Sequence, residues 1–222
     1  VYNYDGSTWN QVGQDIDGDG YSGFSVSLSN DGNTVAISAY IHFPGGLVRV
    51  YNYDGSTWNQ VGQDIDGENP SDGSGEFISL SGDGLIVAIG ATGNSGNGTS
   101  SGHVRIFSLI DTSWIQLGND IDGEAANDRS GSSVSLSNDG YTVAIGSNYN
   151  DGNGPSSGNV RIYTYDGSIW NQLGQDIDGE AAGDESGGSV SLSNNGDTVA
   201  IGAHGNGGDA GHVRIYNWDG SS

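Results

Sequence analysis

Four copies of one sequence unit make up most of this chain of 222 residues. Each copy holds a tryptophan, then an acidic turn, and later a strand-like segment with an arginine at its centre. The tryptophans are Trp9, Trp58, Trp114 and Trp170, and the arginines are Arg49, Arg105, Arg161 and Arg214. A period of about 56 residues with β-type content is typical of propellers and other β-arrays, in which each unit buries its apolar face against its neighbours. The repeat therefore predicts one continuous array with its function on a repeated surface.

The pattern within one copy predicts four short strands. In the third copy, apolar and polar residues alternate over residues 114–121 and 133–137, and further strand patterns cover 141–146 and 160–165. Asn138-Asp139-Gly140 is a typical hairpin turn, because Gly accepts the positive φ that such turns need. We therefore expect an all-β fold, a β-propeller of four antiparallel four-stranded blades. The expected single domain covers 1–222, with repeats at about 1–49, 50–105, 106–161 and 162–214 and a partial fifth repeat at 215–222.

The two ends of the chain have nearly the same sequence. Residues 1–7 repeat residues 50–56, and residues 215–221 are closely similar to both. An N-terminal strand that completes the last blade would close a ring without an exposed edge. In the competing interpretation the chain is cut from a larger ring or fibre, and its edges pair with other chains. The sequence does not decide between the two, and the number of blades in the intact assembly stays open.

The composition excludes several partner classes. The formal net charge is −23, from 28 acidic residues against five basic ones. Such a surface repels nucleic acid and anionic membranes, whereas it attracts hard cations or keeps an edge-rich β protein soluble. The chain has no cysteine, so disulfides and thiol redox chemistry are excluded. No apolar run reaches the length of a membrane-spanning helix and no signal peptide is visible, so we expect no membrane insertion.

The acidic turns are the first candidate sites. Their carboxylates stand at every second position and are Asp15, Asp17 and Asp19; Asp64, Asp66 and Glu68; Asp120, Asp122 and Glu124; and Asp176, Asp178 and Glu180. Three carboxylates next to glycine can surround one hard cation that takes six to eight oxygen ligands, so the pattern predicts Ca²⁺ as a cofactor. In the other interpretation, the first aspartate of each turn forms an ion pair with the repeated arginine, and the other acids face solvent. A mixed arrangement is the third option, and all three stay open.

The aromatic residues bear on a possible sugar site. The four repeated tryptophans are predicted to be core wedges between blades. Tyr51, Tyr53, Tyr163 and Tyr165 lie on the same side of their strands, and they would form sugar-stacking platforms if they were exposed.

The remaining residues give no sign of catalysis. His103 and His212 share a repeat position, but Leu47 and Asn159 fill it in the other copies, so histidine is not a repeated metal ligand. We find no nucleophile–histidine–acid order, no carboxylate pair set apart from the repeats and no phosphate loop, and therefore predict that the chain is not an enzyme. Asn97 begins the single N-glycosylation sequon, Asn97-Gly98-Thr99.

Three segments of the fourth copy carry a family resemblance. Residues 186–193, 198–203 and 211–216 resemble the FG-GAP repeat of integrin-α-type propellers, in which a Phe-Gly-x-Ser-Val strand, a strand ending in Gly-Ala-Pro and a Gly-x-Val-Tyr-Val strand recur once per blade. The likeness extends to all four copies. It implies an extracellular adhesion or ligand-binding module. The family's calcium loop lies between the first two strands, where this chain has only a turn such as Asn-Asp-Gly, so that metal site is not carried over.

These observations predict a non-enzymatic structural or adhesive propeller module at the cell surface or outside the cell. It would be stabilised by cations, belong to a larger repeat protein or assembly, and have other copies of itself or neighbouring repeat modules as partners. The alternative is a multivalent carbohydrate-binding propeller that gains avidity from repeated shallow sites. The two differ in whether the repeated aromatic residues lie in open pockets.

Overall fold

Antiparallel strands form nearly all of the regular structure in the computed structural model, which describes residues 1–220. The first ten strands are β1 (Tyr2–Tyr4), β2 (Trp9–Gln11), β3 (Val26–Leu28), β4 (Thr34–Ala39), β5 (Leu47–Tyr53), β6 (Trp58–Gln60), β7 (Ile65–Asp66), β8 (Phe77–Leu80), β9 (Ile86–Ala91) and β10 (His103–Ile110). They are followed by β11 (Ser113–Gln116), β12 (Ile121–Asp122), β13 (Ser133–Leu136), β14 (Thr142–Ser147), β15 (Asn159–Tyr165), β16 (Trp170–Gln172), β17 (Ile177–Asp178), β18 (Ser186–Leu192), β19 (Thr198–Ala203) and β20 (His212–Asn217), with the short helix α1 (Asn206–Asp209) between the last two. None of the described residues forms a helix with the length and apolar content needed to cross a membrane.

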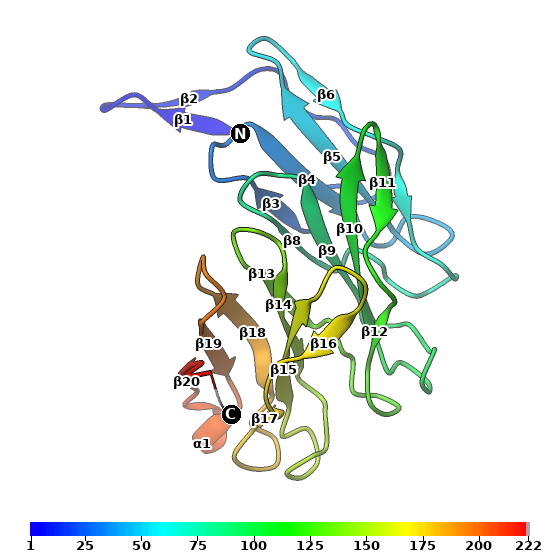
Figure 1. The fold of residues 1–222 in the computed structure, drawn as a ribbon, viewed down its shortest axis with the longest axis vertical. Helices are drawn as coiled ribbons and strands as arrows, with labels where there is room; N and C mark the ends of the chain where they lie inside the picture. The colour runs from blue at the N-terminus through cyan, green and yellow to red at the C-terminus, as the bar shows by residue number, and fades with distance from the viewer. Residues whose placement is uncertain (221–222) are drawn as a thin grey trace.

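Three of the sheets share one plan. Their strand orders are β3-β4-β5-β6, β8-β9-β10-β11 and β13-β14-β15-β16, and in each a two-residue strand (β7, β12 or β17) pairs with the third strand of the sheet. The last sheet has the order β18-β19-β20, and β1 and β2 form a separate two-stranded ribbon. Short turns join the first strand to the second and the third to the fourth, whereas a longer connector joins the second strand to the third. Figure 1 shows the sheets following one another along an open arc from the N-terminal ribbon to the β18–β20 sheet.

Each of the three large sheets begins at a Ser- and Leu-containing strand and ends at a tryptophan strand. Tyr53 of β5, for example, pairs with Trp58 of β6. The sheets are therefore offset from the sequence repeats: a unit such as 50–105 contains the outer strands of one sheet and the inner strands of the next. The partial fifth repeat at 215–222 begins within β20, and its residues 221–222 lie outside the described residues.

The N-terminal strand does not close a ring. β1 pairs with β2 through Tyr4 and Trp9, in the same register as Tyr53 and Trp58 in the β5–β6 hairpin. One edge of β1 is therefore used by its own tryptophan strand, and in the described residues β20 pairs only with β19. Closure by pairing of the N-terminal strand with the last blade, one of the two interpretations that the sequence leaves open, is not formed in the described residues.

The core consists of the layers between neighbouring sheets. Between the first two sheets, Val48 and Val50 of β5 belong to one buried cluster with Ile78, Leu80 and Ile89 of the next sheet. Comparable clusters join the second sheet to the third and the third to the last. Each sheet covers the apolar face of the next sheet. Apolar area buried in these successive layers, and not in a single central core, therefore stabilises the array.

The tryptophans complete these layers. The indole Nε1 of Trp58, Trp114 and Trp170 donates to the carbonyl of Val12, Val61 and Leu117 respectively, each at 2.8 Å. The predicted wedge role is confirmed for these three residues, which are buried or half-buried. It is wrong for Trp9, which is 68% exposed. Trp9 lies in the two-stranded β1–β2 ribbon, where its ring contacts the ring of Tyr4.

Candidate functional site

The first aspartate of each acidic turn is held by a glutamine of the preceding tryptophan strand. The bonds join Gln11 to Asp15, Gln60 to Asp64, Gln116 to Asp120 and Gln172 to Asp176, at 2.8, 2.7, 2.7 and 2.6 Å. Asp64 also accepts two bonds from Arg49, from Nε at 3.0 Å and from Nη2 at 2.9 Å. The guanidinium holds the pKa of the Asp64 carboxyl below its ordinary value. Arg49 reaches Asp19 as well, at 3.2 Å.

The other three arginines make a different contact. Arg105, Arg161 and Arg214 donate through Nη2 to the backbone carbonyls of Asp66, Asp122 and Asp178, at 2.7, 2.8 and 2.6 Å. The guanidinium of each also lies over an aromatic ring two residues later in its own strand. Their main hydrogen-bond partner is therefore the main chain of the acidic turn in the preceding sheet. Among the described residues, the first aspartate of a turn pairs with an arginine only at Arg49 and Asp64. Arg105 adds a longer ion pair to Glu68, at 3.7 Å.

The three carboxylates of one turn do not converge. In the described part of the chain, one set of three His or acidic side chains has its ligand atoms within 4.8 Å of one another, and it consists of Glu68, His103 and Asp120. Only two of these residues belong to the predicted set, and they come from different turns. The physical reason is that the first acid of a turn is tied to its own sheet, whereas the third lies beside the next sheet. Calcium binding at the four turns stays a prediction.

Glu68, His103 and Asp120 come from three places around the second large sheet. Glu68 follows β7, His103 is the first residue of β10, and Asp120 lies just before β12. β12 pairs with the start of β10, opposite His103, and this brings Asp120 beside the histidine. Glu68 and Asp120 are 52 positions apart, so no local motif marks the cluster.

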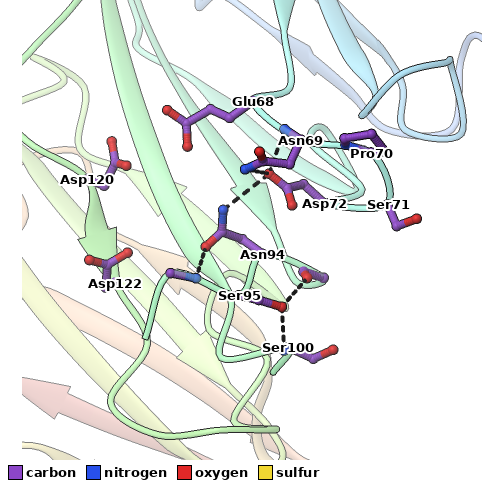
Figure 2. A pocket seen from close by; sticks show the side chains of 12 residues that line it. Glu68, Asn69, Pro70, Ser71, Asp72, Asn94, Ser95, Ser100, Asp120 and Asp122 are labelled. Atoms are coloured by element: carbon purple, nitrogen blue, oxygen red, sulfur yellow. Dashed lines mark hydrogen bonds between the residues drawn. The ribbon is translucent and has the colours of Figure 1, made fainter. Parts of the chain in front are cut away.

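A cleft of ≈ 600 Å³ opens next to this cluster. Its lining includes Glu68, Asp72, Asn94, Asp120 and Asp122, and no aromatic residue. Figure 2 shows the acidic side chains arranged around Asn94, which donates to Asp72 at 3.2 Å. The cleft is therefore polar and anionic, which suits a small cation better than a sugar ring.

His103 is the buried member of the cluster. It is 1% exposed, and its Nδ1 has no hydrogen-bond partner and lies 3.7 Å from an oxygen of Asp120. Burial lowers the pKa of His103 below its ordinary value, and Arg105 acts in the same direction, whereas Asp120, Glu68 and Asp72 oppose it. In its neutral form an imidazole offers one nitrogen lone pair to a ligand.

Three buried aspartates belong to this region and were not predicted. Asp72, Asp128 and Asp184 are almost completely buried, and each accepts a hydrogen bond from an asparagine of the following glycine-rich connector, namely Asn94, Asn150 and Asn206. These contacts hold the connector against the loop that follows the acidic turn. The signal that could have found them is a second periodic motif, Asp-x-Ser-Gly, at 72–75, 128–131 and 184–187.

The sequon asparagine has a structural contact of its own. The amide of Asn97 donates to the carbonyls of Gly123 and Glu124, both at 2.9 Å. Asn153 makes the same contact with Gly179 one copy later, at 3.0 Å. Glycosylation of Asn97 stays a prediction, and it would require the amide to leave both carbonyls.

The comparison with protein families gives one match. Residues 121–163 match the FG-GAP repeat. This span runs from β12 to β15 and includes the Ser-Val-Ser and Thr-Val-Ala-Ile-Gly strands. The predicted resemblance to FG-GAP repeats is confirmed there. No curated protein matches the chain.

Solved structures share the fold at low sequence identity. Hydrazine synthase of Kuenenia stuttgartiensis superposes with a TM-score of 0.60 at 15% identity, over 92% of this chain and 48% of that one. A putative 6-phosphogluconolactonase from Bacteroides uniformis gives 0.55 at 12% identity, over 88% and 55% of the two chains, and a putative TolB from Agrobacterium tumefaciens gives 0.53 at 14%, over 89% and 59%. The chain thus spans about half the length of these proteins. These likenesses support an all-β, propeller-like architecture and carry no information on activity.

Proposed function

We propose that this chain is a non-enzymatic structural propeller module whose two outer faces are covered by further blades of the same kind. The observation that carries the proposal is the outer face of the last sheet. Val213 and Ile215 of β20 are 66% and 70% exposed, whereas Val48, Val104 and Val160 at the position of Val213 are all 0% exposed. Exposed apolar faces of this kind are typical of interaction surfaces.

The opposite end presents the complementary face. Val26 and Leu28 of β3 are 63% and 48% exposed, and their counterparts Ile78 and Leu80 are buried against the preceding sheet. The two ends are therefore the two halves of an interface that the chain already forms three times. Because the halves differ, a second copy of the chain can add head to tail, as in a heterologous contact.

Hydrogen bonds between sheets extend this argument. The hydroxyl of Ser27 accepts from the Leu80 amide at 2.9 Å, and the same bond recurs from Leu136 to Ser79 and from Leu192 to Ser135, both at 3.0 Å. Ser191 stands at the next position of this series, at the exposed end of the array. A docked copy would place the amide of its Leu28 against Ser191.

The experiment is light scattering on a size-exclusion column over a wide range of protein concentration. We expect the mass to rise above 22.8 kDa with concentration, and Ile215→Asp to keep the chain monomeric. Ile169→Asp is the matched control, because Ile169 is also exposed but lies in the turn before β16, away from both faces. A monomer at every concentration, or equal loss of association in both variants, would contradict the proposal.

Adhesion at the cell surface or outside the cell is the finer part of the proposal. The FG-GAP match at 121–163 and the acidic surface support it. The alternative, a carbohydrate-binding propeller, requires repeated aromatic residues in open pockets. Trp58, Trp114 and Tyr163 are instead buried, so we favour the structural role. Binding of the labelled chain to a glycan array and to whole cells separates the two: specific sugar binding at several sites per chain would overturn our choice.

A further inference from the structure

We propose that Glu68, His103 and Asp120 form a binding site for one divalent first-row transition-metal ion, with Zn²⁺ as the reference ion. The cluster offers one imidazole nitrogen and two carboxylate oxygens, all within 4.8 Å of one another. Zn²⁺ takes this donor set in proteins, with ligand distances of about 2.0–2.2 Å. Ca²⁺ prefers oxygen ligands only, so the imidazole argues against it here.

The buried imidazole of His103 is the observation that indicates a ligand at this cluster. A buried polar atom without a partner is uncommon and costs stability, and Nδ1 of His103 is such an atom. It is nearest to Asp120 at 3.7 Å, which is too long for a hydrogen bond. A metal ion between the three side chains would satisfy the nitrogen and both carboxylates together.

The charges around the cleft favour a cation. Asp72 and Asp122 line the same cleft as Glu68 and Asp120, and the nearest positive group is Arg105. The stronger hydrogen bond of Arg105 goes to the carbonyl of Asp66 at 2.7 Å, and its contact with Glu68 is longer, at 3.7 Å. Glu68 can therefore turn to a metal ion while Arg105 keeps its place.

The next copy shows what the same site contains without a histidine. Asn159 takes the position of His103, and its amide donates to Glu124 at 3.2 Å and to Asp176 at 3.4 Å. The asparagine thus bridges the two carboxylates that correspond to Glu68 and Asp120. In the third copy the amide of Asn159 donates to both carboxylates, whereas in the second copy Nδ1 of His103 stands at this position without a hydrogen-bond partner.

This correspondence supplies both test variants. His103→Asn removes the imidazole and introduces the residue that the third copy already accepts. Asn159→His places an imidazole between Glu124 and Asp176 at a position where the second and last copies carry histidine. A thermal melt of each variant verifies that the fold is kept.

The experiment is a calorimetric Zn²⁺ titration of the 222-residue chain, stripped of metal beforehand, with Co²⁺ absorption as a second readout. We expect one site in the parent chain, loss of at least about tenfold in affinity in His103→Asn, since even changes outside the ligand set cost about 10–100-fold, and two sites in Asn159→His. Excess Ca²⁺ should not displace the Zn²⁺. Absence of binding in the parent chain, unchanged affinity in His103→Asn, or a single site in Asn159→His would each overturn the proposal.

Discussion

The guanidinium of Arg161 donates a hydrogen bond from Nη2 to the backbone carbonyl of Asp122, 2.8 Å away and 39 positions earlier in the chain. A second, longer bond joins the same nitrogen to the hydroxyl of Ser130 at 3.4 Å. Arg161 is buried, so its guanidinium needs these acceptors in place of water. The arginine therefore fixes the acidic turn of one sheet against the next sheet.

Replacing Arg161 by methionine should destabilise the fold by about 1–3 kcal/mol. Methionine keeps much of the side-chain length, but it cannot donate, so the bonds to the Asp122 carbonyl and to the Ser130 hydroxyl would both be lost. Arg129→Met is the control, because Arg129 is exposed and its side chain lies over the ring of Tyr149; we expect a change within about 0.5 kcal/mol. Urea unfolding measures both values, and similar losses in the two variants would show that burial of Arg161 does not matter.

Trp114→Phe tests the wedge role of the tryptophans. Trp114 is buried, and its indole donates to the carbonyl of Val61, so the variant loses this bond and leaves a cavity. We expect a loss of about 2–3 kcal/mol in the free energy of unfolding. Trp9→Phe is the same chemical change at the exposed copy and should alter stability by less than about 0.5 kcal/mol. Chemical unfolding followed by far-UV circular dichroism compares the two, since it does not depend on tryptophan fluorescence.

The strands and turns were predictable from the sequence because they depend on local patterns. Alternation and hairpin turns such as Asn138-Asp139-Gly140 occur where the structure has β13 and β14. The grouping of the strands into sheets was harder to predict from the sequence. The tryptophan strand can pair with the strand before it or be grouped with the one after it, and the Tyr53–Trp58 pairing selects the former.

The candidate site was harder to predict, because its residues meet through the packing of different copies. Glu68 and Asp120 stand in the same local motif, which suggests that each works with its own neighbours. Only the fold brings Glu68 beside the following sheet. His103 was set aside because histidine is not repeated at its position, whereas the difference between His103 and Asn159 is what distinguishes the two clefts.

Asp64→Asn should remove a pH-dependent part of the stability. Arg49 holds the pKa of Asp64 below the ordinary value of 3.8. A carboxyl with a depressed folded pKa contributes stability above its unfolded pKa, and this contribution is lost as the pH falls through the folded pKa. Because the pair is partly exposed, we expect a difference of about 1 kcal/mol between the parent and the variant at pH 7. The difference should shrink as the pH falls below the ordinary pKa of 3.8 and through the lower folded pKa.

Urea unfolding at a series of pH values measures this difference. Asp111→Asn is the control, because Asp111 is an exposed aspartate outside the four acidic turns. High salt should reduce the difference at pH 7, since the Arg49–Asp64 pair is accessible to solvent. A difference that persists unchanged at low pH would show that the asparagine acts through packing and not through the ion pair.

Calcium binding at the acidic turns is best tested apart from the histidine site, in the His103→Asn variant. The turn at Asp15, Asp17 and Asp19 is exposed, and its side chains can rearrange around an ion more freely than those near Arg105. If the turns bind Ca²⁺, a concentration about 100 times Kd raises the free energy of unfolding by about 2.7 kcal/mol per independent site, and EGTA reverses the rise. Asp17→Asn should then remove one site, and Asp111→Asn should remove none. A melting temperature that is equal in Ca²⁺ and EGTA would instead leave the turn carboxylates as partners of glutamine and arginine, because occupied cation sites would have to stabilise the folded state.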